Sequence, residues 1–307
     1  MPLYLGIDTS NYTTSAALFD GSLVLENRKL PLPVPQGEKG LRQSDAVFHH
    51  TRQLPELLVP LLSGQKLSAI GVSVSPRDAE GSYMPCFLVG KGQAHVLGAA
   101  LGVPVREYSH QQGHIAAALY SAGRLELLRE TLIAFHVSGG TTEAVLITPG
   151  GMTGPQIKLL AQSLDLKAGQ LIDRVGVALG LDFPCGPALE RLAQKAPRPK
   201  GIRPSVRGAD VSLSGVENQC MAKLRQGEAP ETVARFCIQS VLAALEAMCR
   251  ALLKEFGPLP ILFSGGVSGN SLLREELGSS FGGIFAAPEF SSDNGAGLAV
   301  LAGLESV

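Results

Sequence analysis

Apolar and polar residues alternate along the first thirty positions in a pattern that predicts three adjacent strands. The apolar runs cover residues 3–8, 13–19 and 23–28, and small polar turns separate them. The same order of runs returns at residues 132–138, 141–148 and 157–163. The two openings, LYLGIDTSNYTTSAALFD and LIAFHVSGGTTEAVLIT, each join two strands through a turn that carries Thr-Thr. The pattern therefore indicates an internal duplication.

Between and after these two groups of three strands, segments in which apolar residues have helical spacing alternate with short apolar runs. Helices are expected at 44–62, 86–101, 110–122, 169–179, 187–194, 216–225, 231–256 and 270–277, and a last one begins near Asp293. Strands are expected at 69–74, 103–108 and 261–263. The sequence thus predicts an α/β protein of two related lobes, each a mixed sheet flanked by helices. We expect an N-terminal lobe at 1–108 and a C-terminal lobe at 109–307, with the last helix able to pack back on the first lobe.

The composition is typical of a compact globular protein with about two domains in 307 residues, 45% of them hydrophobic and 17% charged. With 26 basic and 27 acidic side chains, bulk charge does not favour coating of nucleic acid or membranes. Five cysteines without CxxC spacing indicate neither a disulfide framework nor a thiolate zinc site. No leader-like start and no stretch of about 18 apolar residues is evident, so we expect a cytoplasmic protein.

One segment departs from this charge balance. Residues 195–207, KAPRPKGIRPSVR, contain three prolines and no acid, which predicts an extended surface loop. Its basic residues are Lys195, Arg198, Lys200, Arg203 and Arg207. Two interpretations remain open, a solvated linker and a contact with phosphate groups such as those of a tRNA backbone.

Two histidines form the sharpest local motif. His110 and His114 stand four residues apart at the start of an expected helix, which places both imidazoles on one face within reach of one metal ion. Gln111 occupies the place of the glutamate in an HExxH protease, so proteolysis lacks its general base. Asp293 is the candidate third ligand and His136 an additional one. The alternative is a pair of helix-surface histidines.

Glycine-rich turns form a second group. Ser138, Gly139 and Gly140 join two strands, and the turn at 264–266 leads from a strand toward a helix, so both let backbone amides approach a phosphate. Neither turn fits the P-loop or the dinucleotide fingerprint. Matching positions in a duplicated fold favour a nucleotide clamp over two unrelated turns. By the same logic Asp8 ends the first strand at the site, although a turn-capping role is equally compatible.

Polar residues on the following helices are candidates for the rest of a nucleotide site. Asp173 and Glu190 lie on consecutive helices with Gly186 between them, and their carboxylates suit ribose hydroxyls. Asn270, at the start of the helix after Gly266, suits a base or a phosphate. Each has the alternative interpretation of an exposed helix residue.

Seven motifs in order resemble one family, the tRNA threonylcarbamoyladenosine synthases (the TsaD or glycoprotease family) of the actin-like ATPase superfamily. They are GIDTS (6–10), HQQGH (110–114), HVSGGTTE (136–143), GQLIDRVGVALGLDFPCGPALE (169–190), DVSLSG (210–215), SGGVSGNSLLRE (264–275) and SDNGAG (292–297). The resemblance covers nearly the whole chain and implies two actin-like (RNase H-like) lobes.

The resemblance also implies a function. One iron or zinc ion is expected on His110, His114 and Asp293, which would act in catalysis through the metal, and Asp8 is a further expected catalytic residue. ATP or threonylcarbamoyl-AMP is expected on a second set of residues, His136, Val137, Ser138, Gly139, Gly140, Asp173, Gly186, Glu190, Gly266 and Asn270. Family members transfer the threonylcarbamoyl group to N6 of adenosine-37 in tRNA while the metal acts as a Lewis acid. Expected protein partners resemble an inactive paralogue and a small ATPase.

Two departures indicate a divergent paralogue. Residues 11–14, Asn-Tyr-Thr-Thr, stand where the family usually has Cys-Asp-Glu-Thr, and residues 77–85 replace a Gly-Pro-Gly-Leu turn. Alternative functions are therefore carbamoyl transfer from an adenylate to an acceptor other than tRNA, or a nucleotide-binding partner subunit without catalysis. A sugar kinase on the same fold would not need the histidine pair.

Overall fold

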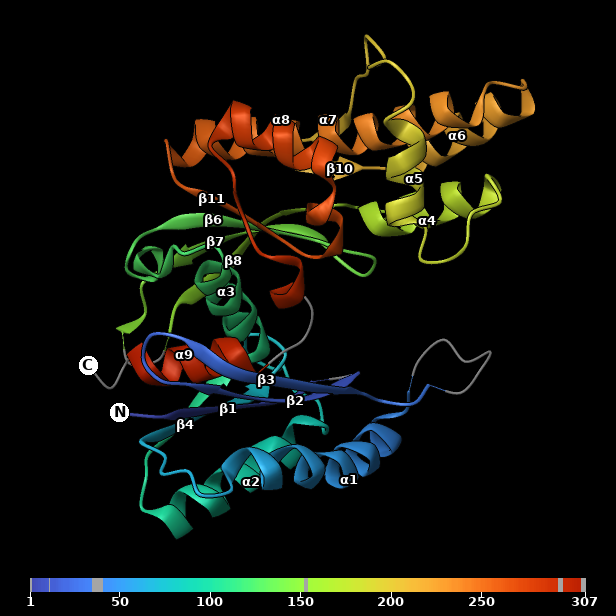
Figure 1. Cartoon of the computed structure of the whole chain (residues 1–307). Coiled ribbons are helices and arrows are strands. Elements are labelled where there is room, and N and C mark those ends of the chain that lie inside the picture. Colours follow the sequence, from blue (N-terminus) through green and yellow to red (C-terminus); the bar gives the residue numbers. More distant parts are fainter. Residues whose placement is uncertain (1, 11, 35–40, 152–153, 292–294, 305–307) are drawn as a thin grey trace. The chain divides into compact units, whose positions relative to one another are not determined.

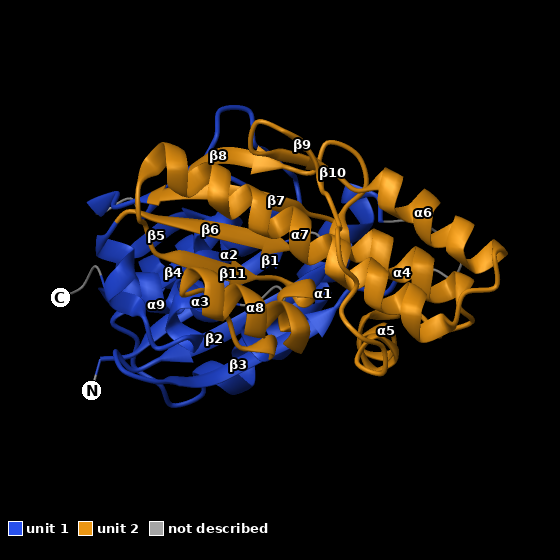
Figure 2. Cartoon of the chain, turned by 90° about the horizontal axis from the view of Figure 1, so that it is seen from above, with its two compact units in different colours: residues 1–130, 148–157, 289–307 blue, residues 131–147, 158–288 orange. Residues whose placement is uncertain are grey.

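The computed structural model describes residues 2–10, 12–34, 41–151, 154–291 and 295–304. The chain forms two compact units, shown in blue and orange in Figure 2. Unit 1 comprises Met1–Glu130, Thr148–Ile157 and Glu289–Val307, and unit 2 comprises Thr131–Ile147 and Lys158–Pro288.

The sheet of unit 1 has the strand order β3-β2-β1-β4-β5. Its strands are β1 (Tyr4–Ser10), β2 (Thr13–Phe19), β3 (Val24–Pro31), β4 (Ala69–Ser75) and β5 (Val105–Ser109). β1 pairs antiparallel with β2 and parallel with β4, which in turn runs parallel to β5. All seven residues of β1 are buried because helices cover both faces of the sheet (Figure 1).

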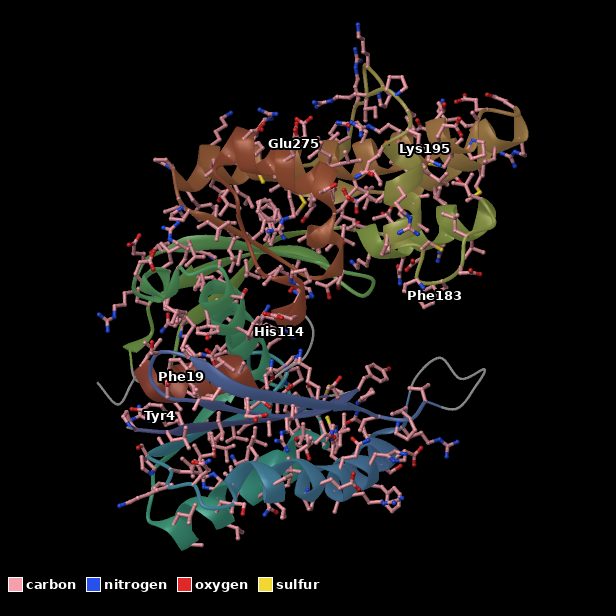
Figure 3. All side chains as sticks on the ribbon, in the orientation of Figure 1. Tyr4, Phe19, His114, Phe183, Lys195 and Glu275 are labelled. Carbon is pink, nitrogen blue, oxygen red and sulfur yellow. The ribbon has the colours of Figure 1, made fainter. Side chains whose placement is uncertain are left out.

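Alternate residues of this sheet join different cores. Leu5 and Ile7 pack with leucines of α1 (Gln43–Leu62), and α2 (Phe87–Leu101) lies on the same side. Tyr4 and Phe19, labelled in Figure 3, pack instead with α9 (Ala296–Leu304). The period of two along a strand thus divides the apolar residues between the two helical layers.

Close backbone contacts hold α9 against the sheet and against α3 (His110–Ser121). A Cβ atom at Gly6 would lie 2.0 Å from the backbone oxygen of Gly295, and one at Gly297 would lie 1.8 Å from that of Gly113. Only glycine permits such an approach. α3, which carries the histidine pair, is therefore fixed by the small residues of α9.

The sheet of unit 2 repeats this topology with the order β12-β11-β6-β7-β8. Its strands are β6 (Leu132–Val137), β7 (Thr142–Thr148), β8 (Gln156–Gln162), β11 (Ile261–Ser264) and β12 (Ile284–Phe285). β6 is antiparallel to β7 and parallel to β11, as β1 is to β2 and β4. The predicted fold class, two related actin-like lobes with mixed sheets, is confirmed.

Helices of unit 2 pack around α7 (Pro230–Phe256). The others are α4 (Ala168–Ala178), α5 (Gly186–Ala193), α6 (Ser214–Arg225) and α8 (Ser271–Phe281). Within the described residues α7 is long and apolar enough to cross a membrane by length and composition, contrary to the sequence expectation. Its side chains Val241 and Leu245 join Phe135 and Phe263 in the core, so α7 is the central core helix of unit 2.

Two further features differ from the sequence expectation. The boundary expected after residue 108 lies elsewhere, because residues 109–130 belong to unit 1, where α3 packs against α9. The loop expected at 195–207 ends in a short hairpin, in which β9 (Ser205–Arg207) pairs antiparallel with β10 (Asp210–Ser212). The remaining expected helices and strands lie within a few residues of their predicted bounds.

Candidate functional site

The histidine pair stands at the beginning of α3, where a capping box fixes the first residue of the helix. The Ser109 hydroxyl accepts a hydrogen bond from the Gln112 amide at 3.2 Å, and the Gln112 side chain accepts one from the Ser109 amide at 2.7 Å. The ring centroids of His110 and His114 are 4.3 Å apart. Both side chains are partly exposed, His114 being labelled in Figure 3. The structure thus places the two imidazoles side by side, as the spacing predicts.

The side chain of Asp8 contacts His110, the first histidine of this pair. Its carboxylate is fully buried and lies 3.1 Å from Nδ1 of His110. Ser73 and Ser10 donate hydrogen bonds to its two oxygens at 2.5 and 2.7 Å. Because all contacts of the carboxylate are with donors, we infer that Nδ1 of His110 carries the proton and that Nε2 carries the lone pair. A carboxylate behind a metal-binding histidine has the same arrangement in known metal sites.

A third histidine, His50, is fully buried near Asp8, and the sequence did not indicate it. The Gln53 amide nitrogen donates to the Pro31 carbonyl at 3.1 Å, so its oxygen accepts from the Thr14 hydroxyl at 2.6 Å. The Thr14 oxygen therefore accepts from Nδ1 of His50 at 2.8 Å. Burial lowers the pKa of His50 to about 4, although the nearby Asp8 charge opposes this shift. His50 is neutral at physiological pH.

The residues of unit 1 fit two of the three ligands that the sequence predicts for a metal ion. Two neighbouring imidazoles, one of them oriented by a carboxylate, suit iron or zinc. Within the described ranges no group of three or more His, Cys, Asp or Glu side chains forms a potential metal site. Asp293, the predicted third ligand, lies outside the described residues.

The first glycine turn of unit 2 joins β6 to β7. Its ends are tied by hydrogen bonds from the Ser138 amide to the Thr141 carbonyl at 2.7 Å and from the Thr141 amide to the Ser138 hydroxyl at 3.1 Å. The turn lies against the start of α4, because a Cβ atom at Gly169 would lie 2.6 Å from the Gly139 nitrogen. Open space adjoins Gly139 and Gly140. Their backbone is therefore accessible to a phosphate group.

The second glycine turn lies beside the first. β11 is the parallel neighbour of β6, and a Cβ atom at Gly265 would lie 2.4 Å from the carbonyl oxygen of the buried Val137. Gly265 has φ +89°, a conformation that favours glycine, and Gly266 faces open space. The Ser264 hydroxyl donates to the Phe135 carbonyl and accepts from Nδ1 of His136 at 3.2 Å. The structure thus brings the two predicted turns together.

The other predicted nucleotide ligands in unit 2 contact the beginnings of helices. Asn270 is the N-cap of α8, and its side-chain oxygen accepts from the amides of Leu272 and Leu273 at 3.1 and 3.2 Å. Glu190 accepts from the Ser271 amide at 2.8 Å. These residues meet at the start of α8, immediately after the second glycine turn.

Asp173 has a separate position, at the start of α5. Its carboxylate accepts from the Cys185 amide at 2.8 Å, next to Gly186, which faces open space. Asp173, like Glu190 and Asn270, therefore stabilises a helix start. For Asp173 and Glu190 the sequence spacing does not indicate this role, because their partner amides lie at the starts of other helices. Asn270 instead caps the first turn of its own helix, which is a local pattern.

Comparisons with known proteins agree with this architecture. The profile of the TsaD family, described as tRNA N6-adenosine threonylcarbamoyltransferase, matches residues 39–300. A Methanopyrus kandleri protein named tRNA N6-adenosine threonylcarbamoyltransferase is 28% identical over 285 residues, which cover 91% of this chain and 80% of that protein.

Solved structures of more distant proteins share the fold. Full-length HypF in its phosphate- and nucleotide-bound form has a TM-score of 0.61 at 13% identity over 99% of this chain and 55% of that chain. A ROK hexokinase from Thermus thermophilus has a TM-score of 0.52 at 18% identity, over 99% and 100% of the two chains. Since the family profile matches far more than half of its length, the chain belongs to the TsaD family of tRNA N6-adenosine threonylcarbamoyltransferases.

Proposed function

We propose that this protein transfers a threonylcarbamoyl group from threonylcarbamoyl-AMP to N6 of adenosine-37 in tRNA. Membership of the TsaD family supports the reaction class. The observation that carries the proposal is the Asp8–His110 pair beside His114, because it orients one of two neighbouring imidazoles that suit a metal ion. Because the proposed substrate is a tRNA, the proposal includes a cytoplasmic location.

The metal-binding part of the proposal rests on unit 1. His110, His114 and Asp293 would hold one iron or zinc ion, which when bound would supply a Lewis acid. Asp8 holds His110 in the tautomer whose Nε2 carries the lone pair. Asp8 is buried, so it acts as a positioning residue for His110. His136 remains a further candidate ligand.

The nucleotide-binding part rests on unit 2. The turns at 138–140 and 264–266 would bind the phosphate of the adenylate through backbone amides, because Gly139, Gly140 and Gly266 face open space. Asp173 and Glu190 would receive the ribose hydroxyls beside Gly186. Asn270 would act through its amide nitrogen, since its oxygen already caps α8.

The turn after β1 differs from the family pattern and bears on the acceptor. Thr14 does not substitute for the missing acidic pair, because its hydroxyl contacts His50 and Gln53 inside the unit. Tyr12 is 40% exposed, which leaves its phenol at the surface. Neither residue supplies the missing carboxylates, so the tRNA acceptor rests on family membership and is tested directly.

The test uses metal-loaded protein, threonylcarbamoyl-AMP labelled in the threonylcarbamoyl group, and an unmodified ANN-decoding tRNA transcript. Label in the tRNA is the expected result, and His114→Ala should abolish it. His95→Ala is the matched control, because His95 is an exposed histidine paired with Glu107. Label that stays in the adenylate, even with proteins resembling the two expected partners present, would contradict the proposal and favour another acceptor or a non-catalytic subunit.

A further inference from the structure

Unit 2 carries one strongly basic surface segment. The segment 195–207, termed the basic arm, follows α5 and ends in β9, and Figure 1 shows it projecting from the helices of the unit. Lys195, labelled in Figure 3, stands at its beginning. Prolines at 197, 199 and 204 restrict its backbone, so less conformational entropy is lost when it binds a partner.

Four of the five cations of the arm form no ion pair in the described part of the chain. Lys195, Lys200, Arg203 and Arg207 are exposed, and none of the ion pairs within the described part of the chain includes them. The whole chain has a net charge of −1, so this local excess of four positive charges is not part of a general basic character. Such a patch suits a polyanion.

Arg198 has a different role from the other four. Its guanidinium pairs with Glu276 of α8 at 2.5 Å, and it lies 3.2 Å from the side-chain amide of Gln239 on α7, whose oxygen accepts from it. Arg198 thus anchors the base of the arm. Arg198 is therefore left out of the proposed binding surface, although the sequence places it in the same run of basic residues as the other four.

Three carboxylates near the arm interact with groups other than the four exposed cations. Glu276 pairs with Arg198, and Glu246, which lines a hollow next to Lys200, pairs with Arg250 at 2.9 Å. Asp210, opposite Arg207 in the hairpin, accepts a hydrogen bond from the Gln162 amide at 2.7 Å. These acids therefore do not recruit the four exposed cations into internal ion pairs.

We propose that the basic arm binds the phosphate backbone of the tRNA substrate through Lys195, Lys200, Arg203 and Arg207. The proposal rests on the proposed function for the identity of the polyanion. Each cation neutralises a phosphate and releases condensed counterions, which gives affinity without reading sequence. The arm accordingly contributes to tRNA binding and leaves metal and nucleotide binding unchanged.

The experiment compares two variants with four substitutions each. The first is Lys195→Ser/Lys200→Ser/Arg203→Ser/Arg207→Ser. The matched control, Lys66→Ser/Lys158→Ser/Arg225→Ser/Lys254→Ser, removes the same charge from exposed positions outside the arm. Affinity for an unmodified ANN-decoding tRNA transcript is measured by fluorescence anisotropy over a range of salt concentrations, and thermal unfolding verifies that each variant is folded.

We expect the arm variant to bind tRNA roughly tenfold or more weakly, with the slope of log K against log salt reduced by roughly 3, since each phosphate contact contributes about 0.7–0.9. The control should retain most of the slope. Equal losses in both variants, or none in the arm variant, would overturn the arm proposal. If the unaltered protein binds vesicles of anionic lipid but no tRNA, both the arm proposal and the tRNA substrate fail. If it binds tRNA but transfers no label, only the proposed function fails.

Discussion

At the level of single residues, the Asp8 carboxylate determines which nitrogen of His110 carries the lone pair. Asp8→Asn removes the charge and retains the size of the side chain. We expect the affinity for Zn²⁺ or Fe²⁺ to fall by roughly 10- to 100-fold, the usual effect of losing a carboxylate behind a ligating histidine. Metal titration of the apoprotein measures it. Glu107→Gln is the control, because this carboxylate also pairs with a histidine, at a surface position; equal affinities in both variants would contradict the interpretation.

The sequence predicts His110, His114 and Asp8 but not the residues that orient them. A turn of helix between two histidines is a local pattern, whereas Ser73 reaches Asp8 from β4, and His50 reaches Thr14 of β2 from α1. Neither neighbour has a spacing relation to Asp8 in the chain. Such contacts depend on how the sheet and its helices pack, so sequence patterns do not reveal them.

His50 should make stability depend on pH. Its pKa is about 4 in the fold and 6.5 when unperturbed, because burial disfavours the charged ring. Between these values the unfolded chain binds more protons, so stability falls as the pH is lowered from 6.5 toward 4. From pH 7 to pH 5 the contribution lost is about 2 kcal/mol.

Urea unfolding of the unaltered protein and of His50→Gln at pH 7 and pH 5 isolates this contribution. The difference between the two pH values should be about 2 kcal/mol smaller in the variant. Other titrating groups affect both proteins alike and cancel in the comparison. An unchanged pH dependence in His50→Gln would show that another group is responsible.

At the level of elements, the glycines of α9 determine how closely this helix approaches its neighbours. A Cβ atom at Gly297 would lie 1.8 Å from the Gly113 carbonyl oxygen, a backbone atom that cannot turn aside. Gly297→Ala should therefore lower the free energy of unfolding by about 1–3 kcal/mol. In Gly92→Ala, within α2, the new methyl group meets open space, so about 0.5–1 kcal/mol of stabilisation is expected. Urea unfolding of both variants tests whether the two substitutions change the free energy of unfolding in opposite directions.

Periodicity predicts long elements well and short ones poorly. Helices such as α1, with buried residues at His50, Leu54, Leu57 and Leu61, show the spacing of an apolar face over several turns. β9 and β10 contain three residues each, and all three residues of β9 are exposed. Too few residues alternate there to distinguish a strand from a loop.

At the level of the whole molecule, duplication is the feature that the sequence predicts best. Two strand–turn–strand openings anticipate two sheets with the same strand order and pair directions. The boundary after residue 108 is less well predicted, because segments far apart in the chain complete unit 1. Residues 289–307 belong to it since α9 packs on β1, a contact made by small residues that leave no periodic signal.

Loss of metal binding and loss of nucleotide binding should be separable, because His114 belongs to unit 1 and Asn270 belongs to unit 2. His114→Ala removes an imidazole from unit 1 and should abolish metal retention with nucleotide affinity unchanged. Asn270→Ser preserves an oxygen that caps α8 but removes the amide nitrogen, so nucleotide affinity should fall roughly threefold to tenfold, the worth of one hydrogen bond of about 0.5–1.5 kcal/mol. Metal analysis and calorimetric titration with a non-hydrolysable ATP analogue measure both quantities in each variant. If a variant loses both metal and nucleotide binding, one binding event requires the other. If a variant keeps both, the substituted residue does not have its proposed role.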